Sequence, residues 1–138
     1  MAISSLIVDT NAVTSLLQGK PDAVALFKEV DRLYFPFIVI AEMYSGFRLG
    51  TKEKSNRENL SQLFGNSDSE ILYPDEITLD QYADIYVSLR KKGKPIPTND
   101  IWIAALALQY HSPLFTFDSH FHHIVQIKVV TTVKEFIG

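Results

Sequence analysis

An apolar run that ends in an acid, Ser5-Leu6-Ile7-Val8-Asp9-Thr10-Asn11, lies at the start of the sequence. A short apolar run of this kind is typical of a buried strand. In open α/β sheets, ligands bind at the carboxyl ends of the strands. Asp9 is therefore expected to place its carboxylate at an edge of the sheet where a site can form.

Three more acids lie in similarly apolar surroundings. They are Glu42 in Ile40-Ala41-Glu42, Asp100 in Pro97-Thr98-Asn99-Asp100-Ile101, and Asp118 in Phe115-Thr116-Phe117-Asp118. Acidic side chains are rarely fully buried unless they are paired or bind a metal ion. Magnesium and manganese prefer oxygen ligands and usually keep several water molecules. The four acids together predict a site for such a cation.

A cation held by these acids would suit the cleavage of a phosphodiester. It can lower the pKa of a bound water and offset the charge that develops in the transition state. Without a cation, clustered carboxylates repel one another, and some of them retain their protons.

The composition is that of an ordinary globular protein. The chain has 138 residues, of which 46% are hydrophobic and 21% charged, and we expect a single domain over residues 1–138. It contains no cysteine, so thiolate metal sites and cysteine nucleophiles are excluded. We find no apolar stretch long enough to span a membrane and no signal segment, and therefore expect a cytoplasmic protein without membrane contact.

The charge is unevenly distributed. The net charge of −3 argues against indiscriminate binding of nucleic acids. The first basic cluster consists of Arg48, Lys52, Lys54 and Arg57, and the second basic cluster consists of Arg90, Lys91, Lys92 and Lys94. Such clusters are usually solvated surface, but they are also the obvious phosphate contacts if the chain binds RNA.

Strand and helix patterns alternate along the chain, which predicts an α/β fold with a mainly parallel sheet. The predicted strands are Ser4–Val8, Leu33–Phe35, Glu70–Tyr73, Leu114–Phe117 and Val129–Thr132. The predicted helices are residues 11–18, Asp22–Val30, Phe37–Leu49, Lys52–Phe64, Leu79–Lys91 and Thr98–Tyr110. Thr10 or Asn11 is expected to cap the first helix and Thr98 the last. Gly65–Ser69 is expected to be a loop, and the run Ile38-Val39-Ile40 could instead extend the second strand.

The acidic segments together resemble the motifs of PIN-domain ribonucleases. The segments that carry the resemblance are Val8-Asp9-Thr10-Asn11, Ala41-Glu42, Asn99-Asp100-Ile101-Trp102-Ile103-Ala104-Ala105 and Thr116-Phe117-Asp118-Ser119-His120-Phe121. The most similar subgroup is the VapC-type toxins of bacterial and archaeal toxin–antitoxin pairs. The resemblance implies a three-layer α/β/α sandwich with a mainly parallel sheet of four to five strands. It also implies RNA cleavage that depends on Mg²⁺ or Mn²⁺, a homodimer, and a cognate antitoxin that blocks the site.

The resemblance assigns roles to individual residues. Asp9, Glu42 and Asp100 match the three core acids of the family's metal site, and Asp118 matches the fourth acid. Two supporting positions and one departure also follow from the resemblance. They are Thr116 as a hydroxyl near the site, Asn11 as a polar neighbour of the first acid, and Phe117 where many relatives carry a basic residue.

Two other functions remain open. The chain could be an acidic-pocket phosphoacceptor or phosphatase-like domain, although an Asp-x-Asp phosphatase would need an acid where the chain has Asn11. It could also be a catalytically inactive PIN-like binding module, although all four acids are intact. His120, His122 and His123 admit a metal site, but imidazole suits zinc or nickel better than magnesium. We therefore interpret these histidines as surface residues of a loop or short helix in which Phe121 is buried.

Overall fold

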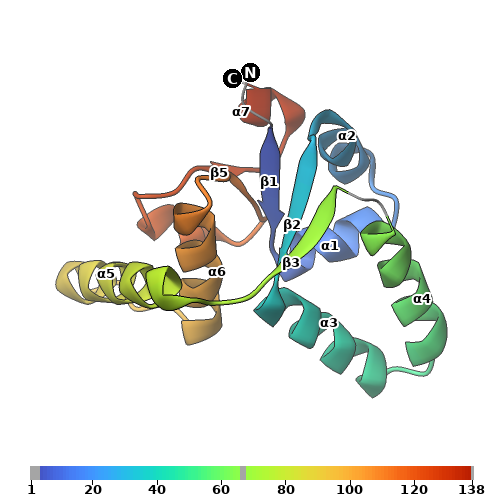
Figure 1. Ribbon diagram of the computed structural model, residues 1–138, viewed down its shortest axis with the longest axis horizontal. Coiled ribbons are helices and arrows are strands. Elements are labelled where there is room, and N and C mark those ends of the chain that lie inside the picture. The colour runs from blue at the N-terminus through green and yellow to red at the C-terminus, as the bar shows by residue number, and fades with distance from the viewer. Residues whose placement is uncertain (1–3, 66–67, 138) are drawn as a thin grey trace.

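The chain folds around a five-stranded sheet, and the computed structural model describes residues 4–65 and 68–137. Figure 1 shows the strands side by side at the centre of the molecule, in the order β3-β2-β1-β4-β5. The strands are β1 (Ser5–Val8), β2 (Arg32–Pro36), β3 (Ser69–Leu72), β4 (Leu114–Phe115) and β5 (Val129–Val130). Each neighbouring pair runs parallel, which confirms the predicted α/β class.

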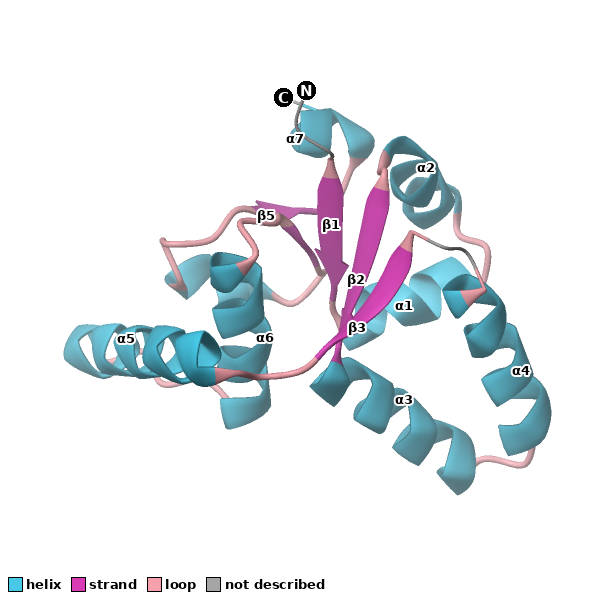
Figure 2. Ribbon diagram, viewed as in Figure 1, coloured by secondary structure: helices cyan, strands magenta, loops and turns pink. Residues whose placement is uncertain are grey.

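Helices cover both faces of the sheet. They are α1 (Thr10–Leu17), α2 (Pro21–Glu29), α3 (Phe37–Leu49), α4 (Glu53–Phe64), α5 (Glu76–Lys92), α6 (Thr98–Gln109), the 3₁₀ helix η1 (Ser119–His123) and α7 (Val133–Ile137). In the view of Figures 1 and 2, α1, α2 and α4 lie to the right of the sheet, and α5 and α6 lie to its left. This arrangement confirms the three-layer α/β/α sandwich. Within residues 4–65 and 68–137, no helix has the length and apolar character needed to cross a membrane.

The strand order reverses between β1 and β4, and we call this place the switch point. The chain builds from β1 through β2 to β3 on one side, and then adds β4 and β5 on the other side of β1. Ligands of open α/β sheets bind where this reversal occurs, at the carboxyl ends of the strands. Val8 pairs with Phe115, so the next residues along the chain, Asp9 and Thr116, lie side by side at this edge.

The core includes the central strands and α6. Ile7 of β1, Phe35 of β2 and Leu106 of α6 are fully buried. α6 packs against α5 and α3, and it is apolar on nearly all sides because it is enclosed. Its buried residues are Ile101, Ile103, Ala104, Ala105, Leu106 and Ala107. This packing holds the first turn of α6, which carries Asp100, in a defined position.

The fourth strand, β4, is shorter than the predicted Leu114–Phe117. It ends at Phe115, and Thr116 and Phe117 lie outside the hydrogen-bonded ladder of the sheet. Hydrogen bonds to side chains at the end of β1 explain the early end. The Thr116 hydroxyl donates to a carboxylate oxygen of Asp9, and the Phe117 N–H donates to the side-chain oxygen of Asn11. The shortened strand thus leaves a segment whose polar groups face the switch point.

Two of the predicted helix caps are wrong. α1 is capped by Asp9, whose side chain accepts the Thr10 N–H, and not by Thr10 or Asn11. α6 begins at Thr98 directly after Pro97, and no side chain caps it. The first acid therefore has a structural role in addition to any chemical one, since it satisfies a free N–H group of α1.

α5 begins at Glu76, earlier than the predicted Leu79. The Asp75 side chain accepts the N–H groups of Ile77 and Thr78, and the Thr78 hydroxyl accepts the Asp75 N–H. This reciprocal capping box extends the helix by almost a turn.

The ends of the other predicted elements agree with the structure to within two residues, which is the usual tolerance of such boundaries, and α7 was not predicted. The ambiguous run at residues 38–40 belongs to α3. The loop predicted over Gly65–Ser69 includes residues 66–67, which lie outside the described residues, and Ser69 begins β3.

Candidate active site

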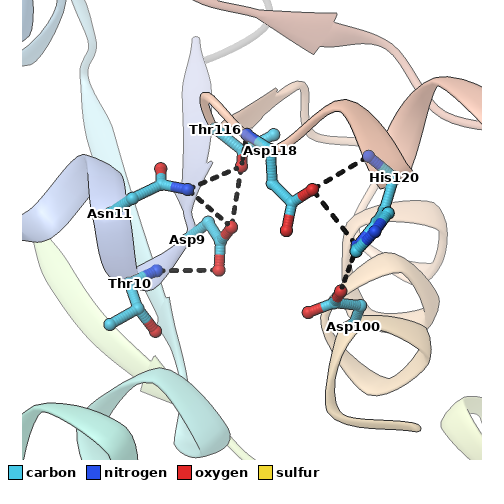
Figure 3. Close-up of polar contacts among 7 residues, drawn as sticks. All are labelled: Asp9, Thr10, Asn11, Asp100, Thr116, Asp118 and His120. Carbon is cyan, nitrogen blue, oxygen red and sulfur yellow. Dashed lines mark hydrogen bonds and ion pairs between the residues drawn. The ribbon is translucent and has the colours of Figure 1, made fainter. Parts of the chain in front are cut away.

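Asp9 lies at the carboxyl end of β1 and is only 5% exposed. Its carboxylate accepts the Thr10 N–H at 2.8 Å and the Thr116 hydroxyl at 2.7 Å (Figure 3). Burial raises the pKa of Asp9, these two hydrogen bonds oppose the rise, and the nearby Asp118 adds to it. The hydrogen bonds thus hold the carboxylate in one orientation, but their donors are neutral groups, so they do not neutralise its negative charge.

Thr116 and Asn11 form a hydrogen-bonded bridge between the ends of β1 and β4. The Thr116 hydroxyl accepts the Asp118 N–H at 3.0 Å while it donates to Asp9. The Asn11 amide group donates to Asp9 Oδ2 and to Thr116 Oγ1, both at 3.4 Å. Its oxygen accepts the Phe117 N–H at 3.0 Å. Both residues therefore orient Asp9 and fix the start of the segment that carries Asp118.

Glu42 approaches this group from α3. The residue as a whole is exposed, but its carboxyl group is partly buried, and this burial raises the pKa of Glu42. Repulsion from Asp9 and Asp100 raises it further, while the Thr10 hydroxyl lowers it. The Thr10 hydroxyl is buried, and its interaction with Glu42 is longer than an ordinary hydrogen bond.

Asp100 and Asp118 come together around His120 (Figure 3). Asp100 lies in the first turn of α6, and Asp118 caps η1. Nδ1 of His120 lies 3.2 Å from Asp118 Oδ1 and 3.5 Å from Asp100 Oδ2. Burial raises the pKa of Asp100, repulsion from Asp9 and Asp118 raises it further, and His120 opposes the rise.

The structure brings all four predicted acids to the switch point. They come from the end of β1, from α3, from α6 and from the segment after β4, and repulsion from neighbouring acids contributes to the raised pKa values of Asp9, Glu42 and Asp100. Potential ligand atoms of Asp100, Asp118 and His120 lie within 4.8 Å of one another, and the described residues contain no other such group of three or more. A cluster of carboxylate oxygens with excess negative charge fits a hard divalent cation.

The interpretation of the histidines as surface residues of a short helix with a fully buried Phe121 is confirmed, since His120, His122 and His123 are all exposed. It did not include the contact that His120 makes with two of the acids. The signal in the sequence is its spacing from Asp118, because a 3₁₀ turn brings such a residue back to the carboxylate, and the His120 N–H indeed donates to Asp118 Oδ1 at 2.9 Å.

The two basic clusters differ in their surroundings. The Lys92 ammonium group of the second basic cluster donates to the His123 carbonyl at 3.1 Å, so this cluster lies against η1. Arg48 of the first basic cluster pairs with Glu53 at 3.2 Å, and Arg57 lies 3.7 Å from the same carboxylate oxygen. Part of the positive charge of the first basic cluster is therefore balanced within the chain.

Phe117 presents an apolar surface next to the acids. Its side chain is about half exposed and packs edge-on against Phe115, with 5.4 Å between the ring centroids. It also lines a cavity of about 500 Å³ together with Lys20 of the α1–α2 connection and Pro21 at the start of α2. At this position next to the acids, the chain thus offers an aromatic ring and no charge.

Replacing Asp100 by Asn should stabilise the metal-free protein increasingly as the pH rises. The pKa values of Asp9, Glu42 and Asp100 are raised in the folded state, above the ordinary 3.8 of Asp and 4.5 of Glu. Their contribution to stability is therefore complete below the ordinary values and is lost as the pH rises through the raised ones. Asp100→Asn removes one of these groups. We therefore expect the melting temperature of the variant minus that of wild type to increase by a few degrees between about pH 4 and pH 7.

This expectation is tested by thermal melting in EDTA across that pH range. The matched control is Asp84→Asn, which removes an exposed carboxylate from α5. For the control, the difference from wild type should not change with pH in this way. If both variants differed from wild type by amounts independent of pH, the raised pKa of Asp100 would be contradicted.

Comparison with known proteins identifies the family. The model of the PIN domain matches residues 6–126, so the chain belongs to the PIN-domain family. Within that family, the chain is 31% identical to Ribonuclease VapC1 of Haemophilus influenzae (strain R2866), over 134 residues that cover 92% of each protein.

Solved structures agree with this assignment. VapBC-1 from nontypeable Haemophilus influenzae aligns with a TM-score of 0.79 and 27% identity, over 91% of this chain and 96% of that one. VapBC-5 from Mycobacterium tuberculosis, a member of the VapBC family of toxin-antitoxin systems, aligns with a TM-score of 0.70 over 92% of this chain and 98% of that one. At 23% identity, the second likeness concerns the fold alone.

Proposed function

We propose that this chain is a metal-dependent endoribonuclease and the toxin of a toxin–antitoxin pair. The observation that carries the proposal is the meeting of Asp9, Glu42, Asp100 and Asp118 at the switch point of a PIN-domain sheet, where the pKa values of the first three are raised. Within residues 4–65 and 68–137, no ion pair balances the charge of Asp9 or Glu42. The likeness to Ribonuclease VapC1 supports RNA as the substrate. Since RNA and a newly made antitoxin meet in the cytoplasm, we place the activity there.

The four acids would hold Mg²⁺ or Mn²⁺, which acts on phosphodiesters as a Lewis acid and lowers the pKa of water. The contribution of the chain is to hold these ligands in place. Thr116 and Asn11 fix the orientation of Asp9, and the packing of α6 fixes Asp100. Because the raised pKa values make the metal-free acids retain protons more readily, binding of a cation would release protons.

We propose that the second basic cluster holds the RNA backbone. The contact between Lys92 and η1 brings this cluster against the segment that carries Asp118, whereas Arg48 of the first basic cluster is paired with Glu53. Replacing Arg90, Lys91 and Lys92 by Gln should weaken RNA binding and flatten its salt dependence, by about 0.7 in the log–log slope for each phosphate that the variant no longer neutralises. Filter binding in EDTA over a range of salt concentrations measures both effects without cleavage.

The matched control replaces Lys28, Lys128 and Lys134 by Gln. These lysines lie in α2, before β5 and in α7, towards the amino ends of the strands and thus away from the acids (Figure 1). The control should change the salt dependence of RNA binding less than the triple variant of Arg90, Lys91 and Lys92 does. Equal slopes for the two triple variants would remove the second basic cluster from the binding surface.

We further propose a homodimer and a cognate antitoxin. The exposed side of α5 is apolar enough to be covered by a second copy of the chain. Its exposed apolar residues are Ile77, Leu79, Tyr86 and Val87. Light scattering of wild type and of Tyr86→Glu tests the dimer, since only wild type should show twice the mass of one chain. The antitoxin is tested by co-expressing the chain with a small protein encoded next to it. The antitoxin should relieve the growth inhibition and co-purify with the chain.

Mapping of the cleavage products separates the nuclease from the other candidate functions. RNA labelled at the 5′ end and RNA labelled internally are incubated with the purified chain and Mn²⁺. An endoribonuclease cuts both substrates at internal positions, so the end-labelled RNA yields shorter 5′ fragments and the internally labelled RNA yields internal ones. A phosphatase-like domain would release only the terminal label, and an inactive binding module would release nothing, so either of these results would reject the proposal.

A further inference from the structure

We infer that His120 is a nitrogen ligand of the metal centre and that it makes the site prefer manganese and later transition metals over magnesium. The inference rests on the proposed metal site and adds a ligand to it. It also assigns the centre a chemical selectivity that four carboxylates alone would not provide.

The position of the imidazole fits a shared cation. In an octahedral site with ligand distances of about 2.1 Å, neighbouring donor atoms lie about 3 Å apart. Nδ1 of His120 lies 3.2 Å from Asp118 Oδ1 and 3.5 Å from Asp100 Oδ2. Both distances are close to this spacing, so the three side chains could share one ion with small movements. His122 and His123 lie in the same turn, but no ion pair joins them to an acid within residues 4–65 and 68–137.

The backbone around His120 keeps the ring at the acids. The Asp118 side chain accepts the His120 N–H at 2.9 Å, and the next residue, Phe121, is fully buried and anchors η1 in the core. The His120 side chain itself is 52% exposed, so core packing does not account for its orientation. An exposed imidazole that points at two carboxylates from an anchored turn is available to a cation without rearrangement of the fold.

The chemistry of imidazole gives the expected selectivity. Carboxylates and water suit magnesium and manganese, whereas imidazole adds affinity for transition metals, in an order that rises from Mn²⁺ through Co²⁺ to Ni²⁺. Magnesium gains little from a nitrogen donor and keeps its water instead. Loss of His120 should therefore weaken Mn²⁺ and Co²⁺ binding more than Mg²⁺ binding.

An ion pair without ligation makes the opposite prediction. If His120 only balances the charge of Asp100 and Asp118, it competes with any cation for them. Its removal would then tighten the binding of Mg²⁺ and Mn²⁺ alike.

Calorimetric titration of the full chain with Mg²⁺, Mn²⁺ and Co²⁺ tests the inference, with His120→Ala as the variant and His122→Ala as the matched control. We expect His120→Ala to raise the dissociation constant for Mn²⁺ by about 10-fold and that for Co²⁺ by more, while that for Mg²⁺ changes less than about 3-fold. Spin-echo spectroscopy of the Mn²⁺-loaded protein should show a ¹⁴N coupling in wild type and His122→Ala that is absent in His120→Ala. Circular dichroism verifies that each variant is folded.

Two groups of outcomes overturn the inference. Equal weakening of all three cations, tighter binding of all three, or no ¹⁴N coupling in wild type would show that His120 is not a ligand. If wild type binds Mn²⁺ without a ¹⁴N coupling and still cleaves RNA, only this inference fails. If wild type binds none of the three cations, the proposed metal-dependent function fails as well.

Discussion

Replacing Asp100 by Asn is expected to reduce the rate of RNA cleavage by more than about 100-fold, because changes that only touch the partners of metal ligands already cost about 10–100-fold. The substitution removes a charged oxygen donor and nearly preserves the shape of the side chain. Asp100 also lies close enough to interact electrostatically with each of the other three acids, Asp9, Glu42 and Asp118. Single-turnover cleavage of labelled RNA with Mn²⁺ measures the effect.

The related acids provide a graded series. Asp9→Asn and Glu42→Gln should cause losses of similar size, while Asp118→Asn should cause a smaller one, because water can replace a fourth ligand. Asp84→Asn, at an exposed position on α5, should retain the wild-type rate. Wild-type activity of Asp100→Asn, with a folded protein by circular dichroism, would reject the role of Asp100.

Replacing Thr116 by Val is expected to reduce cleavage by about 10–100-fold, as is usual for residues that orient metal ligands. Valine has nearly the same shape as threonine but lacks the hydroxyl that donates to Asp9 and accepts the Asp118 N–H. The loss leaves the Asp118 N–H without this partner and the buried Asp9 carboxylate with one hydrogen bond fewer, which costs about 1–3 kcal/mol of stability. Urea unfolding measures the stability, and titration with Mn²⁺ separates weaker metal binding from a slower cleavage step.

The matched variant Thr116→Ser keeps the hydroxyl and removes only a methyl group. It should recover most of the activity and of the Mn²⁺ affinity that Thr116→Val loses. If the two variants were equally impaired, the methyl group, and not the hydroxyl, would be what matters at this position. A stable Thr116→Val variant with full activity would mean that Asp9 is oriented by Thr10 and Asn11 alone.

Much of the fold could be predicted from local patterns. The apolar run that ends at Val8 was recognisable because a central parallel strand is buried on both faces, and Ile7 is indeed fully buried. The run at residues 38–40 was ambiguous as sequence. It became helical because Val39, Ile40 and Met43 lie on the one face of α3 that is buried.

The parts that could not be predicted depend on contacts between distant segments. The fourth strand ends early because Thr116 and Phe117 bond to side chains at the end of β1, which no local pattern reveals. The contact between His120 and Asp100 likewise arises from the packing of η1 near α6. Ligand preference argued against His120, since imidazole is a poor partner for magnesium. The spacing of His120 from Asp118 indicates at most a contact with that acid, and not the contact with Asp100 on another helix.

The most direct test of the proposed function is whether RNA cleavage by the purified wild-type chain depends on a divalent metal ion. The measurement is single-turnover cleavage of an internally labelled RNA in EDTA, followed by addition of Mg²⁺ or Mn²⁺ in excess. We expect no cleavage in EDTA and internal cleavage after either cation is added, with Asp100→Asn inactive throughout. Cleavage at the same rate in EDTA, or no cleavage by the folded protein with either cation, would contradict a catalytic site built from these four acids.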